Sequence, residues 1–221
     1  MKRLIKTMLV GAVAFMLLLP NLSLAYELTG GLKIGGNSAN IYGEDVEEFE
    51  KELDWEWKSK IAFCLGGFIT YNINEVLAIQ PEVLFTQKGA KIKEEIFGET
   101  LNVWMNLSYL EIPVFAKLLI PTKSSVKPNL FAGPYFAIKL SGKAKAEYAG
   151  ESEEEDIEDI KGTDYGLVIG AGVDFGIGGP GMGKITVDLR YSLGLTTISS
   201  YEEEKEDIKN KVILLMVGYS F

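Results

Sequence analysis

The chain has no histidine and only one cysteine, Cys64, in 221 residues. Proteases, phospholipases and lipid A-modifying enzymes usually rely on histidine as a general base or as the partner of a nucleophile, so its absence argues against an enzyme of these kinds. Carboxylate-only chemistry at Glu82 and Glu111 stays open. One cysteine cannot form an internal disulfide, and its spacing suggests no metal site. We therefore expect no catalytic residues, no cofactor and no metal site.

Positive charge is outnumbered by negative charge, with 22 lysines and arginines against 31 aspartates and glutamates. The formal net charge is -9, and it becomes -12 if the first 25 residues, which carry three basic side chains and no acidic one, are removed. A nucleic-acid partner requires a basic surface that neutralises phosphates. The charge balance therefore excludes nucleic acid as an expected partner.

Long hydrophobic runs are absent after the N-terminus. Lys2, Arg3 and Lys6 precede an uncharged run over residues 7–25 that ends in Ser23-Leu24-Ala25. A basic start, an apolar stretch and a small-x-small end are typical of a secretory signal peptide. We predict a signal peptide over 1–25, cleavage between Ala25 and Tyr26, and one mature domain over 26–221. No later run reaches 18 apolar residues, which excludes a transmembrane helix in the mature chain.

The apolar residues that remain alternate with polar ones. Between Leu53 and Ile73 the odd positions are mostly apolar, and the even positions include Asp54, Glu56 and Lys58. A period of two over such a length predicts a β-strand with one apolar face. The same pattern occurs in eight segments, an even number that suits an antiparallel barrel. The segments are 28–37, 53–73, 77–86, 109–118, 129–141, 164–177, 185–195 and 213–221.

The predicted links between strands are alternately long and short. Short links lie near 74–75, 121–126 and 178–183, and long links at 38–53, 89–103, 142–162 and 197–210. Short turns on one side and long external loops on the other are typical of outer-membrane barrels. The long links hold acidic runs at 151–159 and 202–204. Such runs are usually solvated, but divalent cations or surface ligands at these loops remain open as partners.

The polarity of the strands favours a membrane over water. A sheet can cross lipid only when it closes on itself, with strands of ~9–11 residues that turn apolar side chains outward. Aromatic residues near the strand ends, Trp55, Trp57 and Trp104 among them, fit the interfacial belts of such barrels. We predict an all-β fold, an eight-stranded antiparallel transmembrane up-and-down barrel. A soluble lipocalin-like ligand binder, which would have its apolar face inward, is the weaker alternative.

Inward-facing positions carry charges of both signs. An eight-stranded barrel is only wide enough inside for side chains, and an unpaired charge there would be costly, so we predict a lumenal network of ion pairs and hydrogen bonds. Tyr109, Phe115, Phe131 and Tyr135 would add bulk. A small porin-like channel remains the alternative. The predicted network consists of Lys33, Glu82, Glu111, Lys117, Lys139, Asp174, Asp188 and Arg190.

Several motifs resemble the PorT-like outer-membrane β-barrel family. They are GGLKIGGN (30–37), QPEVLFTQKG (80–89), YLEIPV (109–114), FAGPY (131–135) and DLRYSLGL (188–195). The alternating end of the chain also resembles the C-terminal signal that the barrel-assembly machinery reads. That signal would comprise Ile213, Leu215, Val217, Tyr219 and Phe221.

The resemblance implies an eight-stranded barrel in the bacterial outer membrane. We expect it to be monomeric and, because histidine is absent, non-enzymatic, and the signal peptide would direct its export through the inner membrane. Its expected partners are outer-membrane lipid, lipopolysaccharide and the assembly machinery. The resemblance carries no catalytic residues. Long acidic external loops would then serve surface interaction or a structural role.

Overall fold

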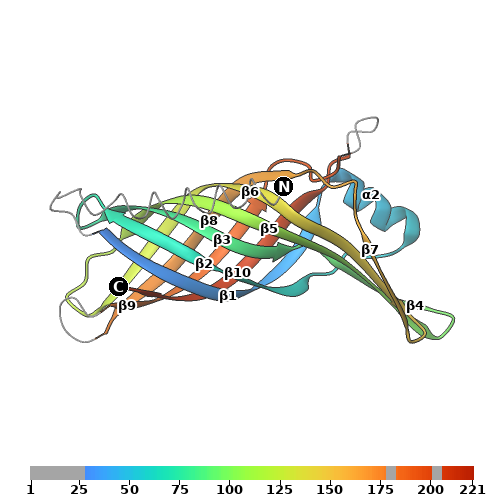
Figure 1. Cartoon of the computed structure of the whole chain (residues 1–221), viewed down its shortest axis with the longest axis horizontal. Helices are drawn as coiled ribbons and strands as arrows, with labels where there is room; N and C mark the ends of the chain where they lie inside the picture. The colour runs from blue at the N-terminus through green and yellow to red at the C-terminus, as the bar shows by residue number, and fades with distance from the viewer. Residues whose placement is uncertain (1–27, 178–182, 201–205) are drawn as a thin grey trace.

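The computed structural model of the chain describes residues 28–177, 183–200 and 206–221 (Figure 1). The predicted signal peptide, its cleavage point between Ala25 and Tyr26, and the acidic run 202–204 lie outside the described residues. None of the helices among the described residues is long and apolar enough to cross a membrane.

Eight strands form a closed antiparallel ring, in which β1 pairs with both β2 and β10. Ile34 of β1, for example, lies opposite Leu65 on one side and Val217 on the other. The prediction of an eight-stranded antiparallel ring is confirmed. The ring strands are β1 (Leu28–Tyr42), β2 (Lys60–Asn72), β3 (Leu77–Lys88), β5 (Glu99–Leu119), β6 (Val126–Tyr148), β8 (Thr163–Gly176), β9 (Lys184–Gly194) and β10 (Lys209–Ser220).

Two further strands correct the predicted loops at 89–103 and 142–162. β4 (Lys91–Ile96) pairs with the first half of β5, and β7 (Glu151–Asp156) pairs with the last part of β6. Together these segments form a four-stranded extension, here called the outer sheet, that projects beyond the ring (Figure 1). Both hairpins turn on residues with positive φ, at 97–98 and 149–150. The prediction treated these segments as loops because it relied on an apolar face that alternates with a polar one. These strands continue the backbone hydrogen bonding of the ring without an apolar face toward lipid.

A helix corrects the start of the second strand. The prediction began that strand at Leu53, but α2 (Glu44–Leu53) ends there and β2 begins at Lys60. Val46, Phe49 and Leu53 recur at spacings of three and four, which is the pattern of one helix face. Three acidic residues occupy the first turn and Lys51 the last, which suits the helix dipole.

The two ends of the ring differ. At the end called here the turn end, β2 and β3 are joined by 73–76 and β5 and β6 by 120–125. At the other end, called the loop end, lie α2 and the outer sheet (Figure 1). The first described residue, Leu28, and the last, Phe221, both lie at the turn end, where the Phe221 amide donates to the Gly30 carbonyl at 2.9 Å.

The ring has apolar side chains outside and charged ones inside. Leu167 is 49% exposed and Leu189 is 56% exposed, whereas Glu82 is 1% and Arg190 3% exposed. This confirms the predicted polarity. It is the reverse of what a lipocalin-like binder requires, so that alternative is wrong. An apolar outer wall is stable in contact with hydrocarbon, where the closed ring leaves no unpaired sheet edge.

Candidate functional site

Four charged side chains meet in the lumen and neutralise one another. Arg190 donates through both guanidinium ends to Glu82, at 2.6 and 2.9 Å, and contacts Asp188 at 2.7 Å. Lys33 contacts Glu82 at 2.9 Å and Asp188 at 2.6 Å. Inward alternation on β1, β3 and β9 brings the four together. With two cations and two carboxylates, bidentate pairing offsets part of the cost of removing the charges from water.

A second charged cluster lies around Lys88. Its ammonium is 2.6 Å from Glu111 and 3.2 Å from Asp164, and it sits 4.1 Å from the centre of the Tyr135 ring. Asp164 also accepts hydrogen bonds from the Tyr135 hydroxyl at 3.1 Å and from the Asn210 amide at 3.0 Å. Cation–π contact and several donors to one carboxylate keep this cluster in a fixed geometry.

Aromatic rings fill the space beside these charges. Phe115 and Phe131 lie 5.0 Å apart, and the Arg190 guanidinium is 5.0 Å from the first ring centre and 5.4 Å from the second. The Phe131 ring reaches into the place where a side chain on Gly170 would stand. The lumen is therefore packed with side chains at this level.

The structure brings together most, though not all, of the residues predicted for the lumen. Lys33, Glu82, Asp188 and Arg190 form one cluster and Glu111 joins Lys88 in the other. Lys117 and Asp174 lie 3.9 Å apart, nearer the turn end. Lys139 takes no part in these clusters, because its ammonium donates to the Ile160 carbonyl at the loop end.

The predicted network left out four lumenal residues. Lys88 continues the inward parity of Gln80, Glu82 and Thr86, so strand parity could have found it. Parity did place Asp164 on the polar side of its strand, but Asp164 was not assigned to the network. Asn210 was placed at the end of a predicted loop. Gln80, which donates to Glu82 at 2.6 Å and accepts from Lys117 at 3.1 Å, was recognised only as a polar position.

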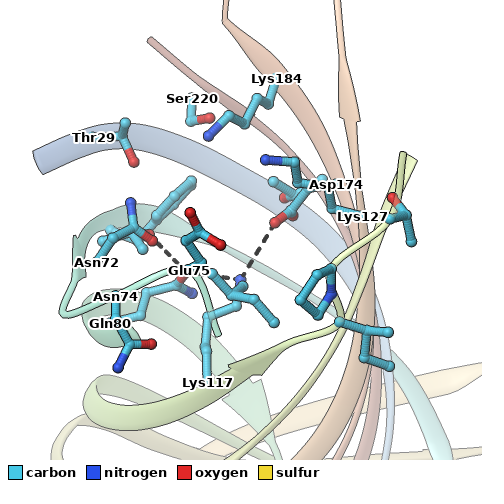
Figure 2. A pocket seen from close by; sticks show the side chains of 17 residues that line it. Thr29, Asn72, Asn74, Glu75, Gln80, Lys117, Lys127, Asp174, Lys184 and Ser220 are labelled. Carbon is cyan, nitrogen blue, oxygen red and sulfur yellow. Dashed lines mark hydrogen bonds and ion pairs between the residues drawn. The ribbon is translucent and has the colours of Figure 1, made fainter. Parts of the chain in front are cut away.

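A cavity of 470 Å³ opens at the turn end. Figure 2 shows its wall of polar side chains, with Lys117 linked to both Gln80 and Asp174. Lys127, Lys184 and Glu75 add further charge around it. Three lysines and two carboxylates line the cavity, so its charges nearly cancel.

A different pocket, of 350 Å³, lies at the loop end beneath α2. Its walls are mainly apolar, with Val46 and Phe49 from the helix and Trp57 from the segment that follows it. Trp57 was predicted to lie in a membrane-interface belt, but it packs instead against Phe49, with ring centres 5.9 Å apart. This corrects the assignment, because the chain before Lys60 belongs to the loop-end structure.

The outer sheet has rows of contrasting character. One row crosses the sheet as Ile92, Val103, Ala146 and Glu153, and the next as Lys91, Trp104, Lys145 and Glu154. Lys143 pairs with Glu154, a hydrogen bond that raises the pKa of the Lys143 ammonium. Every residue of β7 is exposed. The sheet thus presents an acidic outer strand at the loop end.

Metal binding receives no support from side-chain clustering. Within residues 28–177, 183–200 and 206–221, no group of three or more acidic or cysteine side chains is placed to hold a metal ion. The acidic strand β7 spreads its carboxylates along its length instead.

Comparison with known proteins identifies a family. The family model described as outer membrane protein beta-barrel domain matches residues 18–200. No curated protein matches the chain.

Similar solved structures are outer-membrane or surface proteins of bacteria. OprG of Pseudomonas aeruginosa is 13% identical, with coverage of 88% of this chain and 94% of that one and a TM-score of 0.49. Neisserial surface protein A is 15% identical, with coverage of 87% and 97% and a TM-score of 0.44. The attachment invasion locus protein of Yersinia pestis is 19% identical, with coverage of 88% and 99% and a TM-score of 0.41.

Proposed function

Because the chain belongs to the family of outer membrane protein beta-barrel domains, we propose that it is a non-enzymatic outer-membrane barrel with a sealed lumen. Its function would then reside in the surfaces at the loop end. In barrels of this kind the short turns face the periplasm and the long loops face the outside of the cell. The loop end would accordingly be extracellular.

The observation that carries this proposal is the pairing of charges across the lumen. Arg190, Glu82, Asp188 and Lys33 link three strands, and their side chains are at most 2% exposed. An ion passing through would have to break these contacts and leave buried charges without their partners, which is strongly unfavourable. Eight strands also leave little bore to spare. A sealed lumen therefore fits the geometry better than a porin-like channel.

A non-enzymatic role is supported by the same contacts. Glu82 and Glu111, the carboxylates considered for acid–base chemistry, each contact a buried cation, Glu82 through Lys33 and Arg190 and Glu111 through Lys88. A general base must reach a proton of its substrate. A carboxylate held by cations within a packed lumen is poorly placed for that task.

A surface role is supported by the outer sheet. Its acidic strand β7 and the adjoining loop end are suited to a partner with a basic surface. Outer-membrane lipid, lipopolysaccharide and the barrel-assembly machinery remain proposed partners, with the protein as a monomer. The outward-facing positions Ile213, Leu215, Val217, Tyr219 and Phe221 would serve as the assembly signal.

Membership of the PorT-like group is a finer proposal. It rests on the five motifs named above, each of which contributes to a ring strand: 30–37 to β1, 80–89 to β3, 109–114 to β5, 131–135 to β6 and 188–195 to β9. These motifs supply the lumenal side chains Lys33, Glu82, Glu111 and Arg190. The family features and the sealed lumen therefore involve the same residues.

Conductance in planar lipid bilayers tests the sealed lumen. The wild-type protein should give no steady single-channel openings, because the charged clusters and Phe115 and Phe131 close the lumen. Replacing both rings (Phe115→Ala with Phe131→Ala) should produce openings or raise leak current. Heat-modifiable gel migration of the same samples verifies that the barrel is folded. Steady wild-type openings as large as those of the double variant would favour the channel instead.

A further inference from the structure

The pocket beneath α2 is built from chain segments that lie far apart in the sequence. Ile41 comes from the end of β1, Val46 from the helix, Met105 from β5, and Ile160 and Ile198 from the later loop-end segments. Its volume of 350 Å³ lies within the range of about 300–1,000 Å³ that is usual for small-molecule sites. The pocket is large enough for a small organic ligand.

Hydrogen bonds hold the walls of this pocket in place. The Trp57 amide donates to Glu50 at 2.8 Å, and Asn40 donates to the Trp57 carbonyl at 3.3 Å. Across the pocket, the Ile198 amide donates to the Ile208 carbonyl at 2.8 Å, and the Asp207 amide donates to Asp45. A site with fixed walls loses little conformational entropy when a ligand enters.

The pocket combines aromatic rings with apolar side chains. Phe49 and Trp57 are inclined at 37° to each other, and both line the cavity. Aromatic faces attract cations, and tryptophan does so best. The apolar walls would meanwhile bury a hydrocarbon body, which contributes about 25 cal/mol per Å² of apolar surface removed from water.

Charge at the pocket has one sign. Asp45, Asp159 and Glu206 line it, and no basic side chain does so among the described residues. Two lysines lie close to this lining: the Lys139 ammonium is bonded to the Ile160 carbonyl and interacts electrostatically with Asp159, and Lys209 pairs with Asp207, next to Glu206. Lys139 faces Asp159 and the Asp207 amide donates to Asp45, but the three carboxylates of the lining still give it a net negative charge. The pocket therefore disfavours a carboxylate ligand and favours an ammonium.

We propose that this pocket binds a small organic cation, an ammonium head group carried on an aromatic or alkyl body. The body would lie against Val46, Met105 and Ile198, and the head group near Trp57 and Glu206. The site lies at the loop end, outside the charged clusters of the lumen, so binding does not require a conducting barrel. The proposal thus stands independently of the sealed-lumen function.

A series of three probes with one shared body tests the charge preference. The wild-type protein in micelles of a non-ionic maltoside detergent, which carries no ammonium group, is titrated with 4-phenylbutyltrimethylammonium, 4-phenylbutanol and 4-phenylbutyrate, and empty micelles are subtracted. Calorimetry should show the ammonium binding at least tenfold more tightly than the carboxylate, with the alcohol between them. Equal affinities, tighter binding of the carboxylate, or no binding of the ammonium would overturn the proposal.

Paired variants place the binding at this pocket. Trp57→Leu should weaken ammonium binding about threefold or more, whereas Trp104→Leu, on the polar rows of the outer sheet, should leave it unchanged. Glu206→Gln should weaken ammonium but not alcohol binding, and Glu158→Gln, an exposed neighbour outside the pocket, should affect neither. Equal effects within either pair would mean that the probe binds elsewhere. Heat-modifiable migration confirms that each variant is folded.

Discussion

Each buried charge in this barrel is stable only because oppositely charged or hydrogen-bonding side chains surround it. Glu82 accepts from three donors, Lys33, Gln80 and Arg190, and is almost inaccessible to solvent. A buried carboxylate without such partners would be strongly penalised. The stability of each lumenal residue therefore depends on the residues across the ring, and substitutions there should be far from additive.

Removing Arg190 tests this dependence. Arg190→Met leaves Glu82 and Asp188 buried with Lys33 as their closest cation, and it should lower the free energy of unfolding by about 3–5 kcal/mol. The matched control Lys143→Met removes an exposed pair with Glu154 and should cost no more than about 1 kcal/mol. Urea titration of the barrel in detergent micelles, followed by far-ultraviolet circular dichroism of the strands, measures both.

A double variant separates charge imbalance from lost packing. Adding Glu82→Gln to Arg190→Met leaves Lys33 and Asp188 as a balanced pair, so part of the lost stability should return. The lumenal charges do not depend on one another if the effects of the two substitutions on the free energy of unfolding simply add. The same holds if Arg190→Met and Lys143→Met lower that free energy equally.

The sequence predicted which charged side chains point into the lumen better than it predicted which of them pair with one another. Strand parity placed Lys33, Glu82 and Arg190 on one inward face, because alternation of side chains is a property of the backbone. It could not say which cations meet which carboxylates, since that depends on the stagger between strands. Lys139 shows the limit: it lies so near the loop end that it bonds to a backbone carbonyl there.

Among the strand elements, β8 has a specific packing role. Its inward glycines leave room for aromatic rings of β6: a methyl group on Gly170 would meet the Phe131 ring, and one on Gly166 would meet the Tyr135 ring. The neighbouring strand therefore supplies the bulk that β8 lacks. Small residues facing large ones is how a narrow barrel fills its interior.

Gly170→Ala tests this complementarity between strands. The added methyl group would meet both the Phe131 ring and the backbone carbonyl of Leu189, and it should lower the free energy of unfolding by about 1–3 kcal/mol. Gly176→Ala, where an added carbon would make only ordinary contact with Ser125, should have little effect. Urea unfolding compares the two variants. Adding Phe131→Leu to Gly170→Ala should recover the part of the stability lost to the ring contact, and no recovery at all would place the strain at the Leu189 carbonyl instead.

The extramembrane elements were harder to predict than the ring. The eight ring strands carry a strict period of two because one face meets an apolar environment. β4 and β7 need no such face, and the run Glu151–Asp156 is polar at every position, so its strand is set by pairing with β6. α2 was missed although Val46, Phe49 and Leu53 show helical spacing. The acidic residues between them suggested a loop instead.

At the scale of the whole molecule, the protein joins an apolar cylinder to a water-exposed cap of different chemistry. The ring closes on itself, so that its backbone is paired wherever it meets lipid. The cap gathers α2 and the outer sheet at one end (Figure 1). The apolar pocket lies there too, beneath the helix. Such a division allows the cap to change while the ring remains a constant support, as loops on a rigid scaffold generally do.

The last prediction concerns the export and membrane insertion of the 221-residue chain. Expressed in a Gram-negative host, the protein should be recovered from outer-membrane fractions with Tyr26 as its first residue, because Ser23-Leu24-Ala25 fits signal-peptidase cleavage. N-terminal sequencing and fractionation measure this, and unboiled samples should migrate differently from boiled ones. Ala25→Gln should leave the precursor uncleaved, while Tyr26→Gln, just after the cleavage point, should be processed normally. A mature chain that begins elsewhere, or one recovered from the soluble fraction, would contradict the predicted route to the membrane.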